Sequence, residues 1–213
     1  MKRIFILSLA ATSLCSLGQV SAAPYLGFLA GYANTTINTQ KTATTSNDVT
    51  GNHAVNGFAG SLYLGYRHTF AAFNLAGELF GTYYGDTSAE RISSTSTRNK
   101  YGLKVGYGID LLPGFTIAKN INLFAILGVQ STQFTFKRTS SSASTENFDK
   151  NKTLSGIDLG VGTEFTLTDR FSLRMTYKYT AFQSTTLKPS SSYREKFSPR
   201  TNLFGVGIVY HYN

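Results

Sequence analysis

Large apolar residues alternate with small or polar residues along most of the chain, and the alternation is clearest near the C-terminal end. Between Asn202 and Asn213, alternate positions hold Phe204, Val206, Ile208, Tyr210 and Tyr212, and the positions between them hold Leu203, Gly205, Gly207, Val209 and His211. A period of two residues is typical of a β-strand. Glycines suit a crowded interior, so we expect the bulky face of this strand to contact lipid.

The same pattern recurs in seven earlier segments, which makes eight predicted strands. They cover residues 26–33, 58–67, 73–83, 100–111, 121–136, 156–165, 171–180 and 202–213. In the fourth strand we expect Leu103, Val105 and Tyr107 on the lipid face, opposite Lys100 and Lys104. The phase of the fifth strand stays open, because Phe124 and Ile126 are as apolar as Leu123, Ala125 and Leu127.

The connections between these strands alternate in length. Long polar loops are expected at about 34–55, 85–99, 137–152 and 183–199, and short links near 68–70, at Pro113-Gly114 and at Thr168-Asp169. Outer-membrane barrels have short periplasmic turns and long external loops. The pattern predicts an all-β fold, an eight-stranded antiparallel up-and-down transmembrane β-barrel. An even number of strands places both termini on one side, which we expect to be the periplasm.

A soluble sandwich gives no reason for this asymmetry of loops. Aromatic residues also gather near the strand ends, as the girdles of a membrane barrel require. They are Tyr32, Tyr66, Tyr83, Tyr101, Tyr179, Tyr210 and Tyr212.

The N-terminal segment has the three parts of a secretory signal peptide. Lys2 and Arg3 precede an apolar run over residues 4–11, and Val20-Ser21-Ala22 supplies small residues before Ala23. The run is shorter than the roughly 20 residues that a transmembrane helix needs. We therefore expect a signal peptide over residues 1–22 and a barrel over residues 23–213. The one cysteine, Cys15, lies in the signal peptide, so the mature chain is expected to contain no disulfide.

The net charge is +9, from 20 basic and 11 acidic residues. The four expected external loops are basic, which suits lipopolysaccharide phosphates or a host or surface polyanion; a merely solvated surface is the alternative. The cations of the last two loops are Lys137, Arg138, Lys150, Lys152, Lys188, Arg194 and Lys196. Nothing beyond charge indicates nucleic-acid binding, and the pattern leaves the oligomeric state open.

From Tyr25 to Tyr212 the chain resembles the small eight-stranded barrels related to the OmpA membrane domain, OmpX/Ail and the neisserial opacity proteins. The likeness lies in topology and strand pattern. The family contains structural anchors, adhesins and serum-resistance factors, so the resemblance implies an outer-membrane location and a structural or surface-interaction role rather than an activity.

Charged residues of both signs fall on the predicted inward faces. An interior of this size is just wide enough for side chains, and a buried charge needs a partner. We expect a network of ion pairs that plugs the lumen, with Asp158 directly opposite Lys178; a narrow channel for small solutes or ions is the alternative. The network comprises Arg67, Glu78, Lys100, Lys104, Asp110, Asp158, Glu164, Arg174 and Lys178.

No catalytic, metal or cofactor site is predicted. Some barrels of this size resemble lipid A deacylases, whose catalytic His and Ser lie two residues apart. His53, His68 and His211 have no serine at that spacing, and three scattered histidines do not form a metal site. Gly160-Val161-Gly162 and Gly205-Val206-Gly207 precede no helix, so inward glycines of a tight barrel explain them better than a nucleotide loop does.

Overall fold

The structure, a computed structural model, describes residues 20–43, 46–85, 87–92, 97–140, 148–190 and 193–212. Its elements are β1 (Val20–Ala43), β2 (Ser46–Phe70), β3 (Phe73–Tyr84), β4 (Thr87–Ile92), β5 (Thr97–Ala118), β6 (Ile121–Ser140), β7 (Phe148–Thr166), β8 (Phe171–Phe182), β9 (Thr185–Ser190) and β10 (Tyr193–His211). Within these ranges no helix is long and apolar enough to cross a membrane.

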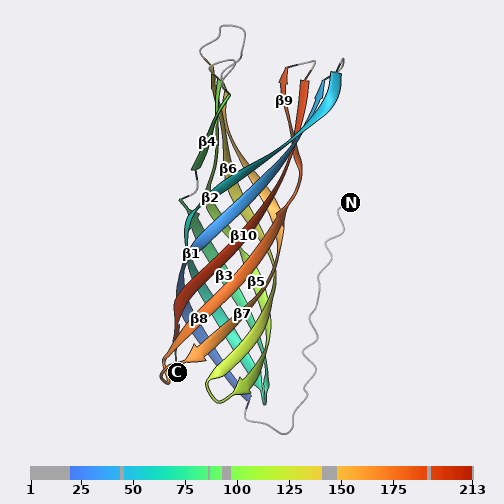
Figure 1. Ribbon diagram of the computed structural model, residues 1–213. Helices are drawn as coiled ribbons and strands as arrows, with labels where there is room; N and C mark the ends of the chain where they lie inside the picture. Colours follow the sequence, from blue (N-terminus) through green and yellow to red (C-terminus); the bar gives the residue numbers. More distant parts are fainter. Residues whose placement is uncertain are drawn as a thin grey trace, which may run out of the picture.

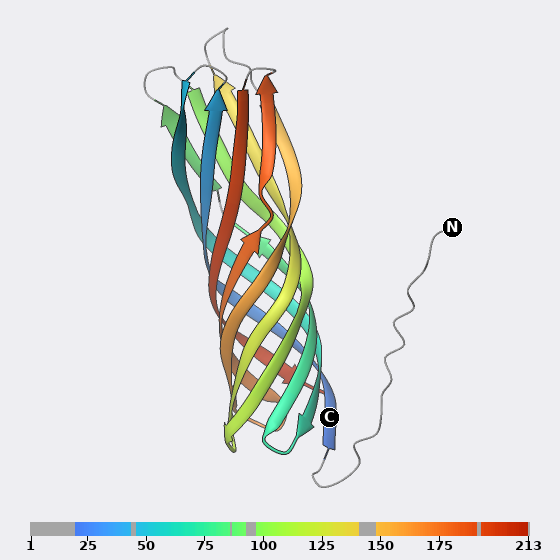
Figure 2. The ribbon, with the colours of Figure 1, turned by 90° about the vertical axis from the view of Figure 1, so that its right-hand side faces the viewer.

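The strands form a closed antiparallel barrel (Figures 1 and 2). Around the wall the order is β1, β2, β3, β5, β6, β7, β8 and β10, and β10 pairs with β1 from Tyr25↔His211 onward to close the ring. The short strand β4 continues the line of β3 along β5, and β9 continues the line of β8 along β10. The prediction of an eight-stranded up-and-down barrel is confirmed.

One end of the barrel carries three short turns, and we call it the short-turn end. The turns are Ala71–Ala72, Lys119–Asn120 and 167–170. The expected turn at Pro113-Gly114 is wrong, because both residues lie inside β5. Pro113 pairs with Leu75 of β3, and on its other side the ladder to β6 passes from Leu111↔Leu127 to Gly114↔Phe124. A proline has no N–H to donate, and this strand contains it without breaking.

At the opposite end, much of what we expected to be long loop is strand. β1 and β2 stay paired from Asn34↔Asn56 to Ala43↔Ser46, and β6 and β7 stay paired up to Arg138↔Phe148. These segments are rich in threonine, a β-branched residue that favours strands, so a polar composition there did not mean a loop.

The paired strands above the barrel belong to two separate groups. β2 pairs with β3 up to Ala59↔Tyr84, and β7 pairs with β8 up to Gly156↔Phe182. Beyond these points the described strands continue as β9–β10–β1–β2 and as β4–β5–β6–β7. Figure 1 shows the two groups projecting from the rim, and we call them the projecting sheets.

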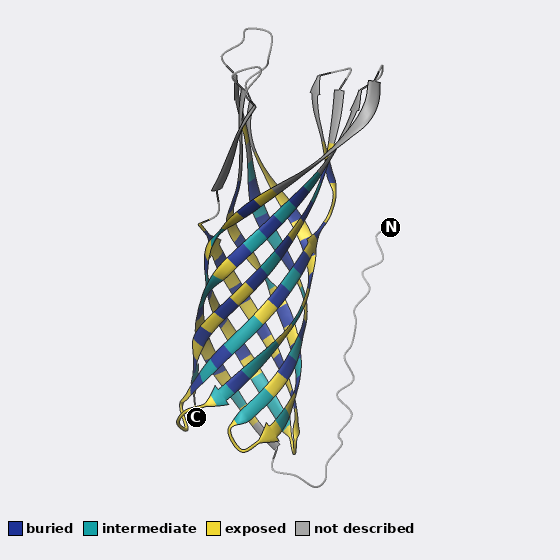
Figure 3. Ribbon diagram, viewed as in Figure 1, coloured by how far each residue is buried: buried dark blue, intermediate teal, exposed yellow. Residues whose placement is uncertain are grey.

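The faces of the barrel wall alternate as the sequence pattern predicted (Figure 3). β3 alternates between exposed and buried side chains over its whole length, with Leu79 57% exposed and Phe80 8% exposed. In β10, Leu203 and Val209 are buried, whereas Phe204 and Ile208 face outward. The exposed side chains are largely apolar, which is the composition of a surface in contact with lipid.

The fourth predicted strand, now part of β5, departs from this pattern. The pairing of β5 with β6 shifts between Leu103 and Gly106, which marks a β-bulge. A bulge adds one residue to one strand, so the faces exchange on either side of it. Leu103 is therefore buried and Lys104 exposed, and both expectations for these residues are wrong. The backbone of Lys100 lies in β5, but its side chain is outside the described part of the structure.

The structure also decides the phase of β6. Phe124 and Ile126 are buried, and Leu123 and Leu127 are exposed. The reason lies in the neighbouring strand, because Phe124 pairs with Gly162 and Ile126 with Gly160. The inward glycines of β7 leave room for the two large side chains.

Candidate functional site

The barrel interior holds most of the charged residues that the strand pattern placed there. Its centre near the short-turn end is Arg174 of β8, which is 2% exposed. Its guanidinium lies 2.5 Å from Oε1 of Glu78 and 3.0 Å from Oε2 of Glu164. Arg67 donates two parallel hydrogen bonds to Glu164, of 3.0 and 2.7 Å. We call Arg67, Glu78, Glu164 and Arg174 the Arg174 cluster.

Aromatic rings surround this cluster. The Arg174 guanidinium carbon lies 4.6 Å from the centre of the Tyr63 ring and 5.1 Å from that of Phe124. The Tyr25 hydroxyl donates a 2.6 Å hydrogen bond to Glu78. Ring faces attract the guanidinium and exclude water from it, so the ion pairs lie in surroundings that strengthen them.

A second charged group, the Lys178 cluster, lies further from the short-turn end. The Lys178 ammonium is 3.2 Å from Asp158 and 3.4 Å from Asp110. Thr180 donates a 2.7 Å hydrogen bond to Asp158 and accepts one of 3.1 Å from Gln130. Two carboxylates thus share one ammonium. Gly128 makes room for this arrangement, because a Cβ added there would lie 1.9 Å from Oδ1 of Asp110.

The pairing of β7 with β8 differs from the register that we expected. Asp158 lies opposite Thr180, Lys178 opposite Gly160, and Glu164 directly opposite Arg174. The predicted contact between Asp158 and Lys178 exists, but it is diagonal. The turn sets this register: the N–H groups of Leu167 and Thr168 both donate to the carbonyl of Phe171. With this turn, each β7 residue pairs two residues further along β8 than expected, as Asp158 pairs with Thr180 in place of Lys178.

Of the nine charges predicted to face inward, the structure brings seven together. These are Arg67, Glu78, Asp110, Asp158, Glu164, Arg174 and Lys178. Lys104 lies on the outside, and Lys100 is outside the described side chains. The seven comprise four carboxylates and three cations.

His211 joins the Arg174 cluster, a contact that sequence reasoning missed. Its Nε2 lies 3.1 Å from Oε1 of Glu164 and 3.1 Å from the hydroxyl of Ser172. The alternation of β10 had placed His211 inward, but no spacing along the chain links it to Ser172. A Ser–His–acid triad needs the acid on one imidazole nitrogen and the serine on the other. Here both contact Nε2, so the three side chains form a structural hydrogen-bond group.

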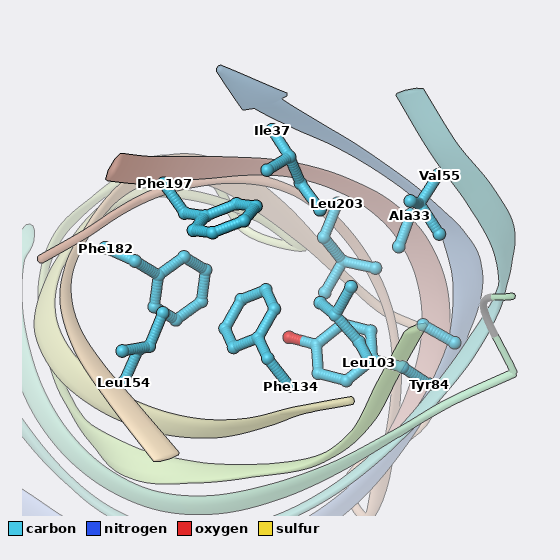
Figure 4. Packing of buried hydrophobic residues seen from close by; sticks show 11 residues of the cluster. Ala33, Ile37, Val55, Tyr84, Leu103, Phe134, Leu154, Phe182, Phe197 and Leu203 are labelled. Atoms are coloured by element: carbon cyan, nitrogen blue, oxygen red, sulfur yellow. The ribbon is translucent and has the colours of Figure 1, made fainter. Parts of the chain in front are cut away.

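Towards the projecting sheets the interior becomes apolar. Figure 4 shows side chains from all around the wall pointing inward, with Phe134, Phe182 and Phe197 at the centre. The rings of Phe134 and Phe182 pack edge to face, with 5.0 Å between the ring centres. We call this cluster the apolar plug; it comprises Ala33, Ile37, Val55, Ala59, Tyr84, Leu103, Phe134, Leu154, Phe182, Phe197 and Leu203. Sequence reasoning missed it because several of its members lie in segments that we took for polar loops.

Little open space remains between the two charged clusters and the plug. A cavity of about 40 Å³ lies there, bordered by Glu78, Asp110, Arg174 and Lys178. A larger cavity of about 220 Å³ opens at the short-turn end, with Arg67, Asp169, Ser172 and His211 in its lining. Charged side chains near the short turns and apolar side chains beneath the projecting sheets occupy the described interior.

The predicted basic residues lie at the end opposite the short turns. Lys137 of β6, Lys152 of β7 and Lys196 of β10 are exposed. The Lys152 ammonium donates to the hydroxyl of Thr185 in β9 and so links the two projecting sheets at their base. The side chains of the other four, Arg138, Lys150, Lys188 and Arg194, lie outside the described part of the structure.

A comparison with protein families assigns the class of this barrel. The profile of the family described as "Outer membrane protein beta-barrel domain" matches residues 6–212. The chain belongs to this family. It is therefore a bacterial outer-membrane β-barrel protein, as the exposed apolar wall indicates. No curated protein matches the sequence.

Solved structures with a similar fold are small outer-membrane barrels. Ail of Yersinia pestis is 16% identical, with 88% of this chain and 98% of that chain covered and a TM-score of 0.41. Neisserial surface protein A is 12% identical, with 89% of this chain and 98% of that chain covered and a TM-score of 0.49. The outer membrane protease OmpT of Escherichia coli is 8% identical, with 91% of this chain and 96% of that chain covered and a TM-score of 0.46.

Proposed function

We propose that this outer-membrane protein is a closed barrel with a surface-interaction role, and that its projecting sheets carry the contacts. One observation supports the proposal: charged and apolar clusters occupy the described interior, while paired strands continue beyond the barrel rim. A solute path would have to cross the Arg174 cluster, the Lys178 cluster and the apolar plug in turn. A filled lumen leaves the outer surfaces as the part of the molecule that can act.

The proposed orientation places the short-turn end and both termini in the periplasm. Outer-membrane barrels of this class have short periplasmic turns. The projecting sheets then extend away from the cell. Signal peptide cleavage after Ala22 would leave the mature chain beginning close to the short-turn end, where Ala23 pairs with Arg67.

The proposed partner is anionic. Exposed Lys137, Lys152 and Lys196 lie on or below the projecting sheets, and lysines there favour phosphate- or sulfate-bearing polymers and lipopolysaccharide. The sheets also present strand edges: β2 beyond Ala59 and β4 each pair on one side in the described structure. Such edges can add an extended segment of a partner by backbone hydrogen bonds.

Two measurements on the refolded protein test the proposal. On an immobilised heparin column, replacing Lys150, Lys152, Arg194 and Lys196 together by Gln should lower the salt concentration of elution, because surface charge attraction is screened by salt. Lys104→Gln, an exposed cation of the barrel wall below the projecting sheets, is the control and should elute as the wild type does. Ail has been crystallised with the heparin analogue sucrose octasulfate, and this compound serves as a soluble competitor.

The second measurement is single-channel recording in planar bilayers. A closed barrel should give no resolved conductance steps, whereas the narrow-channel alternative requires them. Regular conductance steps in the wild type would refute the closed barrel. Elution of the quadruple variant from heparin at the wild-type salt concentration would refute the anionic partner.

A further inference from the structure

A hollow lies on the outer wall of the barrel, separate from the interior sites. It has a volume of about 670 Å³ and an almost wholly apolar lining. The lining comprises Phe73, Pro113, Gly114, Phe115, Leu123, Phe124, Ala125, Val161, Gly162, Thr163, Met175, Thr176, Tyr177 and Phe204. Phe73, Phe115, Leu123 and Phe204 are among the exposed apolar residues of the wall, so the hollow faces the membrane.

The pairing of the strands explains its shape. One row of neighbours across the wall runs through Phe115, Leu123, Thr163 and Met175. The next row runs through Ala125, Val161, Tyr177 and Phe204. The first row has Phe115 and Leu123 at one end and Met175 at the other, and the second row has Tyr177 and Phe204 at one end. The smaller Thr163 and Ala125 lie in the first and second row. The result is a trough in the wall.

The trough begins near the short-turn end and rises towards the middle of the barrel. Phe73 and Leu123 lie close to the turns Ala71–Ala72 and Lys119–Asn120, whereas Tyr177 and Phe204 lie further along their strands. Its length therefore runs with the depth of the lipid leaflet at that end. An acyl chain that enters from the membrane surface follows the same direction.

Two cations lie at the turn end of the trough. Lys119 is in the turn that joins β5 to β6, Arg170 is in the turn that joins β7 to β8, and both are exposed. The two turns lie side by side, since the N–H of Thr166 donates a 2.9 Å hydrogen bond to the carbonyl of Asn120. The third turn, Ala71–Ala72, carries no charge. Asp169 lies next to Arg170 in the same turn, so the three turns together carry two cations and one carboxylate. The net charge is positive where a lipid phosphate would lie if its chain filled the trough.

We propose that the trough is a site for an anionic phospholipid, with one acyl chain along Ala125 and Thr163 and the phosphate beside Lys119 and Arg170. The proposal rests on the proposed orientation only for the source of the lipid, which would be the periplasmic leaflet. The chemistry is the same in either orientation: an apolar chain in a groove and a phosphate between two cations.

The absence of tryptophan from the chain allows a direct test. A single reporter, Tyr177→Trp, stands at the trough, and Leu64→Trp on β2 is its control on exposed wall at a similar distance from the short turns. Each variant is reconstituted in phosphatidylcholine vesicles that contain a few mole per cent of phosphatidylglycerol with brominated chains, which quenches nearby tryptophan. We expect at least twofold stronger quenching of the trough reporter than of the control.

Two further variants in the Tyr177→Trp background separate the parts of the site. Lys119→Gln with Arg170→Gln should reduce the quenching to that of the control, and brominated phosphatidylcholine in place of phosphatidylglycerol should do the same. Ala125→Leu fills the trough without changing the cations, and it should also remove the excess of quenching over the control. All of these changes lie on the surface, and heat modifiability on gels confirms that each variant is folded.

Equal quenching of the two reporters would overturn the site. Excess quenching that survives loss of both cations would overturn the assignment of an anionic headgroup. Cross-linking of two chains through Ala125→Cys, in a mature chain that otherwise has no cysteine, would instead assign the trough to a second copy. None of these results depends on the heparin or conductance measurements, so the trough and the surface role can fail separately.

Discussion

Arg174 is the single residue on which the interior near the short-turn end depends most. It bridges Glu78 and Glu164 and contacts the rings of Tyr63 and Phe124. Each carboxylate is almost wholly buried. Ionised groups in such surroundings are tolerated when they are paired, and removing one partner costs more than the pair contributed.

Replacing Arg174 by Met should therefore destabilise the barrel strongly. Glu164 keeps Arg67, but Glu78 keeps only the hydroxyl of Tyr25 among the contacts described here. We expect a loss of about 3–5 kcal/mol, reduced by any water that enters the lumen. The loss is measured as the urea midpoint of unfolding in detergent, with exposed Arg170→Met as the control. A midpoint equal to that of the control would mean that the cluster does not stabilise the fold.

The Lys178 cluster predicts a coupling between residues that are not direct strand partners. Asp158→Ala and Lys178→Ala should each lower the melting temperature in detergent, and Lys178→Ala more so because it also leaves Asp110 unpaired. The double variant should recover part of the summed loss. Strictly additive losses would show that Asp158 and Lys178 do not interact.

Among the elements, β5 shows how a local irregularity changes what a pattern means. Its apolar and polar residues alternate without a break in the sequence, yet the bulge between Leu103 and Gly106 exchanges the two faces. Leu103 thereby joins the apolar plug, and Lys104 turns outward.

The bulge can be tested by two truncations of similar size. Leu103→Ala removes packing from a residue that is 2% exposed and should cost about 2–5 kcal/mol. Val105→Ala, at a position that is 47% exposed on the outer face, should cost much less. Unfolding in urea gives both values. Similar, small costs at both positions would restore the uninterrupted alternation, in which Leu103 and Val105 share the outer face, and would remove the bulge.

For the whole molecule, the outward apolar residues predict insertion into a membrane. Val105→Arg places a charge on the lipid-facing wall and should cost roughly 2–4 kcal/mol if the residue lies near the middle of the hydrocarbon layer. The wild type should migrate differently on gels before and after boiling. Protein that stays soluble without detergent after refolding would contradict the membrane assignment.

The division of the barrel into a charged half and an apolar half is also a property of the whole molecule. Ion pairs fill the part near the short turns, and the apolar plug fills the part beneath the projecting sheets. The plug forms where β3 and β8 end, at Tyr84 and Phe182, so the wall opens directly above this apolar cluster. Under the proposed closed-barrel function, changes in the projecting sheets would leave the interior clusters in place.

The sequence by itself determined the properties that depend on neighbours along the chain. The alternation of large and small residues decided which face of most strands meets lipid, and the resulting strand count and short turns decided the closed barrel. The same alternation placed Arg67, Glu164 and Arg174 inside. The cleavage site after Ala22 stays a prediction from the sequence alone.

Only the tertiary structure decided what depends on register. Glu164 contacts Arg174 and His211 because two features place the three residues at the same level along the barrel axis. These are the turn after Thr166 and the closure of β10 onto β1. The phase of β6 follows from the glycines of β7, the position of Leu103 from a bulge, and the apolar plug from residues of many strands. Pairing across strands depends on turn length and on contacts between distant segments. A two-residue alternation looks the same in every register, so it does not specify which residues pair.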